Sequence, residues 1–144
     1  MTTSILQRSR AVVAVLATVL LCASCTSTPP LPGDLKVGEI TTGRMIGPDG
    51  QITEESRTTL FWTTDTFYAS VATDGSAQNV PITARWSGPD GKVAAEVTKT
   101  ISPSGSTTTT FEAPPKDGRW AAGDYKVDVL VNGGSQGSKD INAR

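Results

Sequence analysis

The sequence predicts a single all-β domain, built as a sandwich of about seven or eight short strands. From residue 36 onward, apolar side chains recur at every second position, which is the period of a half-buried strand. Turn-forming combinations of Gly, Pro, Asp and Asn separate these alternating segments. Threonine, which favours strands, is frequent, and no long window repeats with a helical period. A chain of 144 residues has room for one such domain.

Residues 1–24 have the three parts of a secretory signal peptide. Two arginines and no acid precede an almost unbroken apolar run over residues 11–21, and small residues follow it. Counted generously, the run extends from Ala11 to Ser24, which is shorter than the roughly 20 residues that a membrane-spanning helix needs. We therefore expect residues 1–24 to form a signal helix that is removed on export.

The end of this segment, Ala23-Ser24-Cys25, resembles the lipobox of bacterial lipoproteins, in which small residues precede an obligatory cysteine. Cys22 stands where the family favours leucine, and this is the one departure. The resemblance implies that the Cys25 thiol carries diacylglycerol and that its freed amino group receives a further acyl chain such as palmitate. Cys25 would then attach the protein to a membrane, because two or three acyl chains anchor a protein durably.

Residues 25–35 are predicted to connect the lipidated Cys25 to the folded domain. Three prolines, together with Thr, Ser and Gly, favour an extended, disordered tether. Thr26 follows Cys25 where an aspartate would favour the inner membrane, which resembles outer-membrane cargo of the family. The resemblance implies a cell-envelope location, on the outer membrane facing the periplasm in a Gram-negative host. Because neither cysteine follows residue 25, the mature chain forms no internal disulfide.

Four segments of the domain expected at residues 36–144 alternate between apolar and polar positions, and each predicts a half-buried strand. They lie at residues 67–72, 80–87, 93–97 and 125–131. The expected inward positions are Phe67, Ala69, Val71, Val80, Ile82, Ala84, Trp86, Val93, Ala95, Val97, Tyr125, Val127, Val129 and Val131. Leu130 falls among the outward positions of the last segment.

Two identical turn sequences, Gly-Pro-Asp-Gly, occupy residues 47–50 and 88–91. Proline fixes φ at one turn position, and glycine accepts the positive φ that another position requires. The flanking residues match loosely, since residues 42–55 and 83–96 share Thr, Arg and Glu at equivalent positions. We interpret this match as two hairpins that use one favourable turn, in preference to a duplication. Asp-Gly at 74–75 and Asn-Gly at 132–133 are shorter turn signals.

A further group of residues indicates which type of β-sandwich the chain forms. The run Gly-Asp-Tyr-Lys-Val, residues 123–127, resembles the tyrosine corner of immunoglobulin-like domains. The spacing of Val71, Trp86 and Val127 along the chain is similar to that of the Cys…Trp…Cys core of those domains, with valine in place of both cysteines. The resemblance, which covers residues 60–144, implies an immunoglobulin-like antiparallel β-sandwich. Residues 36–57 form either an extra strand pair or its first strand.

Residues 118–133 also resemble the end of small immunoglobulin-like domains that occur in many bacterial lipoproteins. The shared features are a Gly-x-Trp, a Gly-x-Tyr, alternating valines and a closing Asn-Gly turn. This resemblance implies a fold and a cellular location, and no enzymatic activity accompanies it.

Composition disfavours most catalytic and nucleic-acid-binding classes. The chain has no histidine, and no cysteine follows Cys25, which leaves no Ser-His-Asp or Cys-His catalyst. A net charge of −1 and a pI near 5.3 provide no basic footprint for nucleic acid. The carboxylate pairs Glu54/Glu55 and Asp124/Asp128 are interpreted as solvated surface acids. We therefore expect a protein that is not an enzyme.

Cofactor and metal sites are not expected either. Asp49, Asp90 and Asp117 each precede a glycine, but a calcium loop needs several oxygen ligands in close succession. Turn geometry explains these single acids better. The sequence contains no Walker A motif and no Gly-x-Gly-x-x-Gly before a helix, so nucleotide cofactors have no support.

Three aromatic residues, Trp62, Tyr68 and Trp120, are the candidate contacts for a ligand or partner, whereas Trp86 is expected in the core. The competing interpretation is that Trp62 and Trp120 close the two ends of the sandwich. Residues 135–142 are predicted to be a weak edge strand, on which two charged residues discourage pairing.

These observations predict a membrane-anchored cell-envelope lipoprotein with a non-catalytic structural or protein-interaction role. Its expected partners are the membrane, through the acyl chains on Cys25, and an envelope protein. The alternative is a glycan-binding or small-ligand-binding module that uses the exposed aromatic residues.

Overall fold

A computed structural model describes residues 31–144. The predicted signal helix, Cys25 and most of the predicted tether lie outside the described residues. Within them no helix is long and apolar enough to cross a membrane. The strands are β1 (Lys36–Gly43), β2 (Leu60–Phe61), β3 (Phe67–Asp74), β4 (Val80–Ser87), β5 (Val93–Ile101), β6 (Thr107–Ala113), β7 (Gly123–Val131) and β8 (Gly134–Ala143), with short 3-10 helices η1 (Glu54–Ser56) and η2 (Lys116–Gly118).

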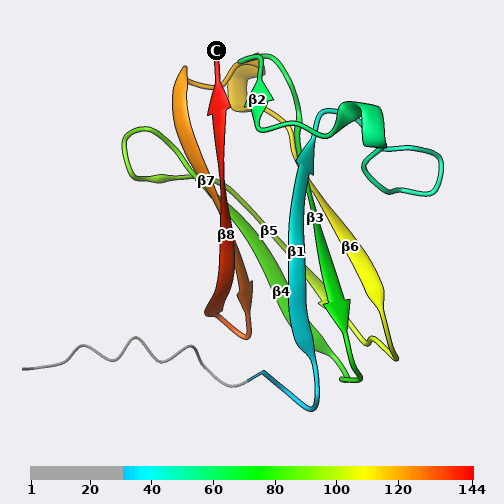
Figure 1. Ribbon diagram of the computed structural model, residues 1–144. Coiled ribbons are helices and arrows are strands. Elements are labelled where there is room, and N and C mark those ends of the chain that lie inside the picture. The colour runs from blue at the N-terminus through cyan, green and yellow to red at the C-terminus, as the bar shows by residue number, and fades with distance from the viewer. Residues whose placement is uncertain (1–30) are drawn as a thin grey trace, which may run out of the picture.

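The strands form two sheets that face each other (Figure 1). One sheet has the order β1-β3-β6, and the other has the order β2-β8-β7-β4-β5. Neighbouring strands are antiparallel except β2 and β8, which are parallel. The chain therefore changes sheet between β1 and β2. This arrangement confirms the predicted all-β sandwich of seven or eight strands.

The core lies between the sheets, and the period-two pattern predicts most of it. Val71 of β3, Trp86 of β4 and Val127 of β7 are all 0% exposed, and they come from both sheets. These are the three positions that match the Cys…Trp…Cys spacing, so apolar packing takes the place of a disulfide there. The fully buried neighbours on the same three strands are Phe67, Ala69, Ile82, Ala84 and Val129.

The tyrosine corner is confirmed. The Tyr125 hydroxyl donates a hydrogen bond to the carbonyl oxygen of Ala121 at 2.9 Å, four residues upstream. The ring is buried near the start of β7 and packs edge-on to Phe67 of the opposite sheet at 5.4 Å. This one side chain therefore fixes the loop before β7 and also contributes to the core.

Tyr125→Phe is expected to lower the free energy of unfolding by about 1 kcal/mol, because it removes one hydrogen bond and keeps the ring. Burial raises the pKa of the Tyr125 phenol, and the Asp90 carboxylate adds to the rise. The unfolded chain therefore loses this proton first, and wild-type stability falls as the pH rises past about 10. Urea denaturation at pH 7 and at about pH 10.5 measures both effects. Equal stability of wild type and variant at pH 7 would contradict the role of the hydroxyl.

Both Gly-Pro-Asp-Gly turns form, with the same hydrogen bonds. The amide of Gly50 donates to the Gly47 carbonyl at 2.9 Å, and the amide of Gly91 donates to the Gly88 carbonyl at 2.9 Å. In each turn the aspartate side chain accepts a hydrogen bond from the amide two residues later, at 3.1 Å in the first turn and 3.0 Å in the second. The carboxylates of Asp49 and Asp90 therefore stabilise turns, as expected.

The two turns differ in what they connect. The second joins β4 to β5 in a long hairpin, whereas the first is flanked by a single bridge between Ile46 and Ile52. Residues 44–57 leave β1 and fold over the outer face of the three-stranded sheet, where Ile52 is buried. A β-carbon on Gly43 would overlap Cγ2 of Ile52, so the glycine allows this close approach. Of residues 36–57, only β1 is thus a sandwich strand, and it is the first.

Two inward or outward assignments were wrong. Val93 is 53% exposed, because a bulge sets it opposite Ser87, an outward residue of β4. Leu130 is only 6% exposed, since it lies in a central strand between β4 and β8. The predicted edge strand at 135–142 is correct for most of its length, because β8 pairs with β7 throughout and β2 covers only its last two residues, Asn142 and Ala143.

The two sides of the sandwich close differently. On one side β1 approaches β8, where a β-carbon on Gly137 would lie 3.3 Å from Cδ1 of Ile40. On the other side β5 and β6 are both sheet edges. There Lys99 of β5 points inward, because it pairs opposite Ile82. Its Nζ donates to the Thr110 carbonyl of β6 at 2.6 Å and lies 5.7 Å from the Phe111 ring.

The predicted start of the domain at residue 36 is the first residue of β1. Two residues of the preceding segment also touch the core, since Leu35 is buried and Leu31 packs against it. The Ser76 amide donates to Asp34 at 2.7 Å, which places this segment beside the β3–β4 loop. The C-terminus lies at the opposite end of the sandwich (Figure 1). We call these the entry end and the far end.

Candidate functional site

Trp120 is buried, so its prediction as an exposed contact was wrong. It is 5% exposed, and its ring stacks on Phe67 with centroids 4.5 Å apart and planes 10° apart. Its Nε1 donates to the carbonyl oxygen of Asp65 at 2.9 Å. The competing interpretation is correct for this residue, because Trp120 closes the far end of the core.

Tyr68 is half-buried and lies on the outer face of the three-stranded sheet. Its register neighbours are Gly43 on β1 and Glu112 on β6. Burial raises the pKa of the Tyr68 phenol, and the negative charge of Glu112 contributes to the rise. Since Trp62 follows a strand of the other sheet, the three candidate aromatic residues do not form one surface.

Trp62 is the candidate that remains exposed, at 53%. It directly follows β2 at the far end, and the guanidinium carbons of Arg44 and Arg144 each lie 5.8 Å from its ring centroid. The Trp62 amide donates to Asp65 Oδ2 at 2.8 Å. The same carboxylate oxygen lies 3.1 Å from Nε of Arg44 as an ion pair. The indole is therefore held in place while about half of its surface faces solvent.

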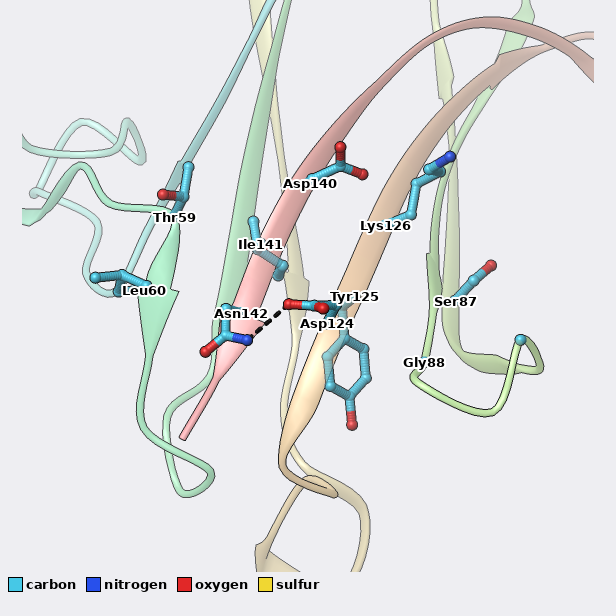
Figure 2. A pocket seen from close by; sticks show the side chains of 11 residues that line it. Thr59, Leu60, Ser87, Gly88, Asp124, Tyr125, Lys126, Asp140, Ile141 and Asn142 are labelled. Carbon is cyan, nitrogen blue, oxygen red and sulfur yellow. Dashed lines mark hydrogen bonds between the residues drawn. The ribbon is translucent and has the colours of Figure 1, made fainter.

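A groove of about 590 Å³ lies on the outer face of the five-stranded sheet. Figure 2 shows β7 and β8 crossing its floor, with β2 on one side and the turn that begins at Ser87-Gly88 on the other. A volume of this size is typical of small-ligand sites. The side chains that give it chemical character are Leu60, Asp124, Lys126, Asp140 and Asn142.

The polar side chains of the groove floor come from paired positions of two strands. Asn142 Nδ2 donates to Asp124 Oδ1 at 2.7 Å, the bond drawn in Figure 2. Lys126 and Asp140 are direct partners in the β7–β8 register. The floor thus presents carboxylate, amide and ammonium groups side by side, with donors and acceptors both available.

The groove was not predicted, although six of its residues lie in segments that the sequence predicts as strands. The sequence did not predict β2, because this strand has only two residues and no alternation of its own. It pairs with the last residues of β8 and so creates one wall. A two-residue strand produces no periodic signal.

The carboxylate pairs considered in the sequence occupy surface positions. Glu54 is exposed and forms an ion pair with Arg57 at 2.7 Å. Asp128 accepts a hydrogen bond from Ser135 at 3.2 Å, and Asp124 accepts one from Asn142. Among residues 31–144, no three acidic, histidine or cysteine residues come together as a metal site would require. Cys25 lies outside the described residues.

Comparison with known proteins supports the architecture. No family model matches the chain, and no curated protein matches it either. A solved immunoglobulin-like protein from Pseudomonas aeruginosa is similar over 78% of this chain and 98% of its own, with 14% identity and a TM-score of 0.51. The fold is immunoglobulin-like.

A second solved structure contains a similar domain within a larger protein. The alkylpurine DNA glycosylase AlkC from Pseudomonas fluorescens matches 79% of this chain, with 16% identity and a TM-score of 0.50. This chain spans 31% of the glycosylase. At such identities both likenesses describe the immunoglobulin-like fold alone, so the function has to be argued from the site.

Proposed function

We propose that this protein is a lipid-anchored cell-envelope protein whose immunoglobulin-like domain is a non-catalytic interaction module. The lipobox-like Ala23-Ser24-Cys25 supports the anchor. The lack of histidine and the absence of a metal-ligand cluster among residues 31–144 support a role without catalysis. The immunoglobulin-like fold supports a module that presents loops and sheet faces to other molecules.

The observation that carries this proposal is the position of Trp62 relative to the anchor. The chain enters the domain at Lys36, and β1 runs to Gly43 at the far end, beside Arg44 and Trp62. A domain attached through residues before Lys36 would present Trp62 away from the membrane. Exposed tryptophan and arginine are the residue types most enriched where binding energy concentrates in interfaces.

Cys25→Ala is expected to release the protein from membranes without changing the fold of the domain. The physical reason is the loss of acyl chains, each of which contributes about 0.8 kcal/mol per buried methylene. Membrane fractionation followed by immunoblotting measures the release. Ser24→Ala is the matched control, since it keeps a small residue beside an intact cysteine. Continued membrane fractionation of the Cys25→Ala protein would contradict the anchor.

The interaction role is tested by a photo-crosslinking amino acid placed at residue 62 of the full chain in intact cells. The control position is Gln78, an exposed residue in the loop at the entry end. We expect one envelope protein to be captured from position 62 and not from position 78, with capture reduced when Cys25→Ala is added. The same products from both positions, or none from position 62, would contradict an interaction surface at the far end.

A further inference from the structure

We propose that the groove between β2 and the 88–91 turn binds a neutral oligosaccharide, one sugar ring of which stacks on Trp62. This site goes beyond the proposed protein-interaction role and does not depend on the anchor. The inference rests on three observations: the side of the sheet that Trp62 faces, the chemistry of the groove floor, and the charge of the surface around it.

Trp62 lies on the same face of the sheet as the groove. Phe61 and Ala143 are register partners, and both are buried on the inner face. Since successive residues of a strand point to opposite faces, Leu60 and Trp62 point outward. Leu60 lines the groove and is 41% exposed, and Trp62 continues that wall toward the far end with its indole 53% exposed.

The β2–β8 ladder continues past the two strands and fixes this wall. The Arg144 amide donates to the Phe61 carbonyl at 2.9 Å, and the Thr63 amide donates to the Arg144 carbonyl at 3.2 Å. Trp62 and Arg144 are therefore neighbours across the two parallel chain segments, one residue beyond the Phe61–Ala143 pair. The aromatic wall is preorganised by backbone hydrogen bonds, which lowers the entropic cost of binding a ligand.

The groove floor has the hydrogen-bonding groups that sugar hydroxyls need. Asp124 and Asp140 accept, Lys126 donates, and the Asn142 amide does both. The Asp124–Asn142 hydrogen bond of 2.7 Å holds two of these groups in a fixed arrangement. A hydroxyl is both donor and acceptor, so a polyol can pair with such a mixed set, while its C–H faces suit an indole ring.

The charges of the groove disfavour other ligand classes. The floor of the groove carries Asp124, Asp140 and Lys126, while Arg44 and Arg144 flank Trp62 and Asp65 pairs with Arg44. These three acidic and three basic side chains balance in charge, which favours a neutral ligand over phosphate or nucleic acid. The floor exposes charged side chains, which disfavours a lipid tail. A cationic peptide is the remaining competitor, since the two acids of the groove floor exceed its one base, and the experiment below includes it.

The test is nuclear magnetic resonance of the ¹⁵N-labelled full chain in micelles of a detergent without a sugar headgroup. The chain has three tryptophans, so three indole N–H signals report separately on the exposed Trp62 and the buried Trp86 and Trp120. The probes are chito-oligosaccharides, malto-oligosaccharides and β-1,3-glucan oligomers, together with spermidine and a lysine-rich peptide. We expect one oligosaccharide class to shift the Trp62 signal saturably while the Trp86 and Trp120 signals stay in place.

Substitutions test whether the oligosaccharide binds in the groove and on Trp62. Trp62→Ala and Asp140→Ala are each expected to weaken oligosaccharide binding by about tenfold or more, measured from the backbone amide signals of the groove residues, which both variants keep. Tyr68→Ala, which removes an aromatic residue from the other sheet, is the matched control and should leave binding unchanged. Asp140 makes no hydrogen bond or ion pair that the fold needs among residues 31–144, so this variant keeps the test valid if Trp62→Ala does not fold.

The proposal is overturned if no oligosaccharide shifts the Trp62 signal, if spermidine or the peptide shifts it instead, or if oligosaccharide binding is unaffected by both groove variants. These outcomes are independent of the crosslinking result, because binding here is measured without cells. A protein partner captured at position 62 with no oligosaccharide binding would leave the interaction role standing and remove this inference.

Discussion

Trp86→Ala is expected to lower the free energy of unfolding by about 3–5 kcal/mol, the range for truncation of a large aromatic residue in a core. Trp86 is 0% exposed and lies on β4, between β5 and β7 of the larger sheet. A domain of this size is commonly stable by only about 5–15 kcal/mol, so the variant loses a large share of its stability. Urea denaturation followed by circular dichroism measures the change.

Two further variants test whether the stability lost in Trp86→Ala comes from core packing. Trp62→Ala is the same substitution at an exposed site and should change stability by only about 0.5 kcal/mol. Trp86→Phe should cost much less than Trp86→Ala, because it keeps a ring and removes an indole N–H that has no hydrogen-bond partner among the described residues. Equal losses from Trp86→Ala and Trp62→Ala would show that Trp86 does not organise the core.

Gly123→Ala is expected to cost about 2–5 kcal/mol, the sum of backbone strain and overpacking. Gly123 has a φ of +140°, and a β-carbon there would lie 2.6 Å from Cγ of Pro89. The proline ring belongs to the second Gly-Pro-Asp-Gly turn and has little freedom to move. This contact joins the turn to the start of β7, two residues before Tyr125. Thermal and urea unfolding measure the loss.

Gly91→Ala is the matched control, because Gly91 lies in the same turn with a φ of +75° and open space around it. It should cost only about 1–2 kcal/mol, from backbone conformation alone. Adding Pro89→Ala should recover part of the Gly123→Ala loss and none of the Gly91→Ala loss. Equal costs for the two glycine variants, with no recovery, would mean that the Pro89 contact is unimportant.

The sequence predicted the fold well wherever a strand buries one whole face. The segments around Val71, Trp86 and Val127 alternate, with Leu130 as an exception, because each strand has the core on one side. A bulge breaks this alternation, since one extra residue turns the following side chains to the other face of the sheet. Val93 is exposed for that reason, although its sequence spacing resembles that of its buried neighbours.

The candidate site could be predicted only in part. Trp62 and Trp120 are the same residue type, yet one is exposed and the other stacks on Phe67. What separates them is the position of each beside a distant strand, which local spacing does not encode. The groove depends in the same way on β2 reaching the end of β8, the last strand of the chain and far from β2 in the sequence.

The lysine that spans the β5–β6 side has a consequence for the association of this protein with itself. Two free strand edges lie along that side, and free edges are where chains add to one another. Lys99 donates to a carbonyl on one edge while being part of the other, so one ammonium group protects both. A change of one nucleotide converts a lysine codon to methionine or isoleucine. Such a change would remove the ammonium group from both edges at once and leave β5 and β6 open to pairing with another strand.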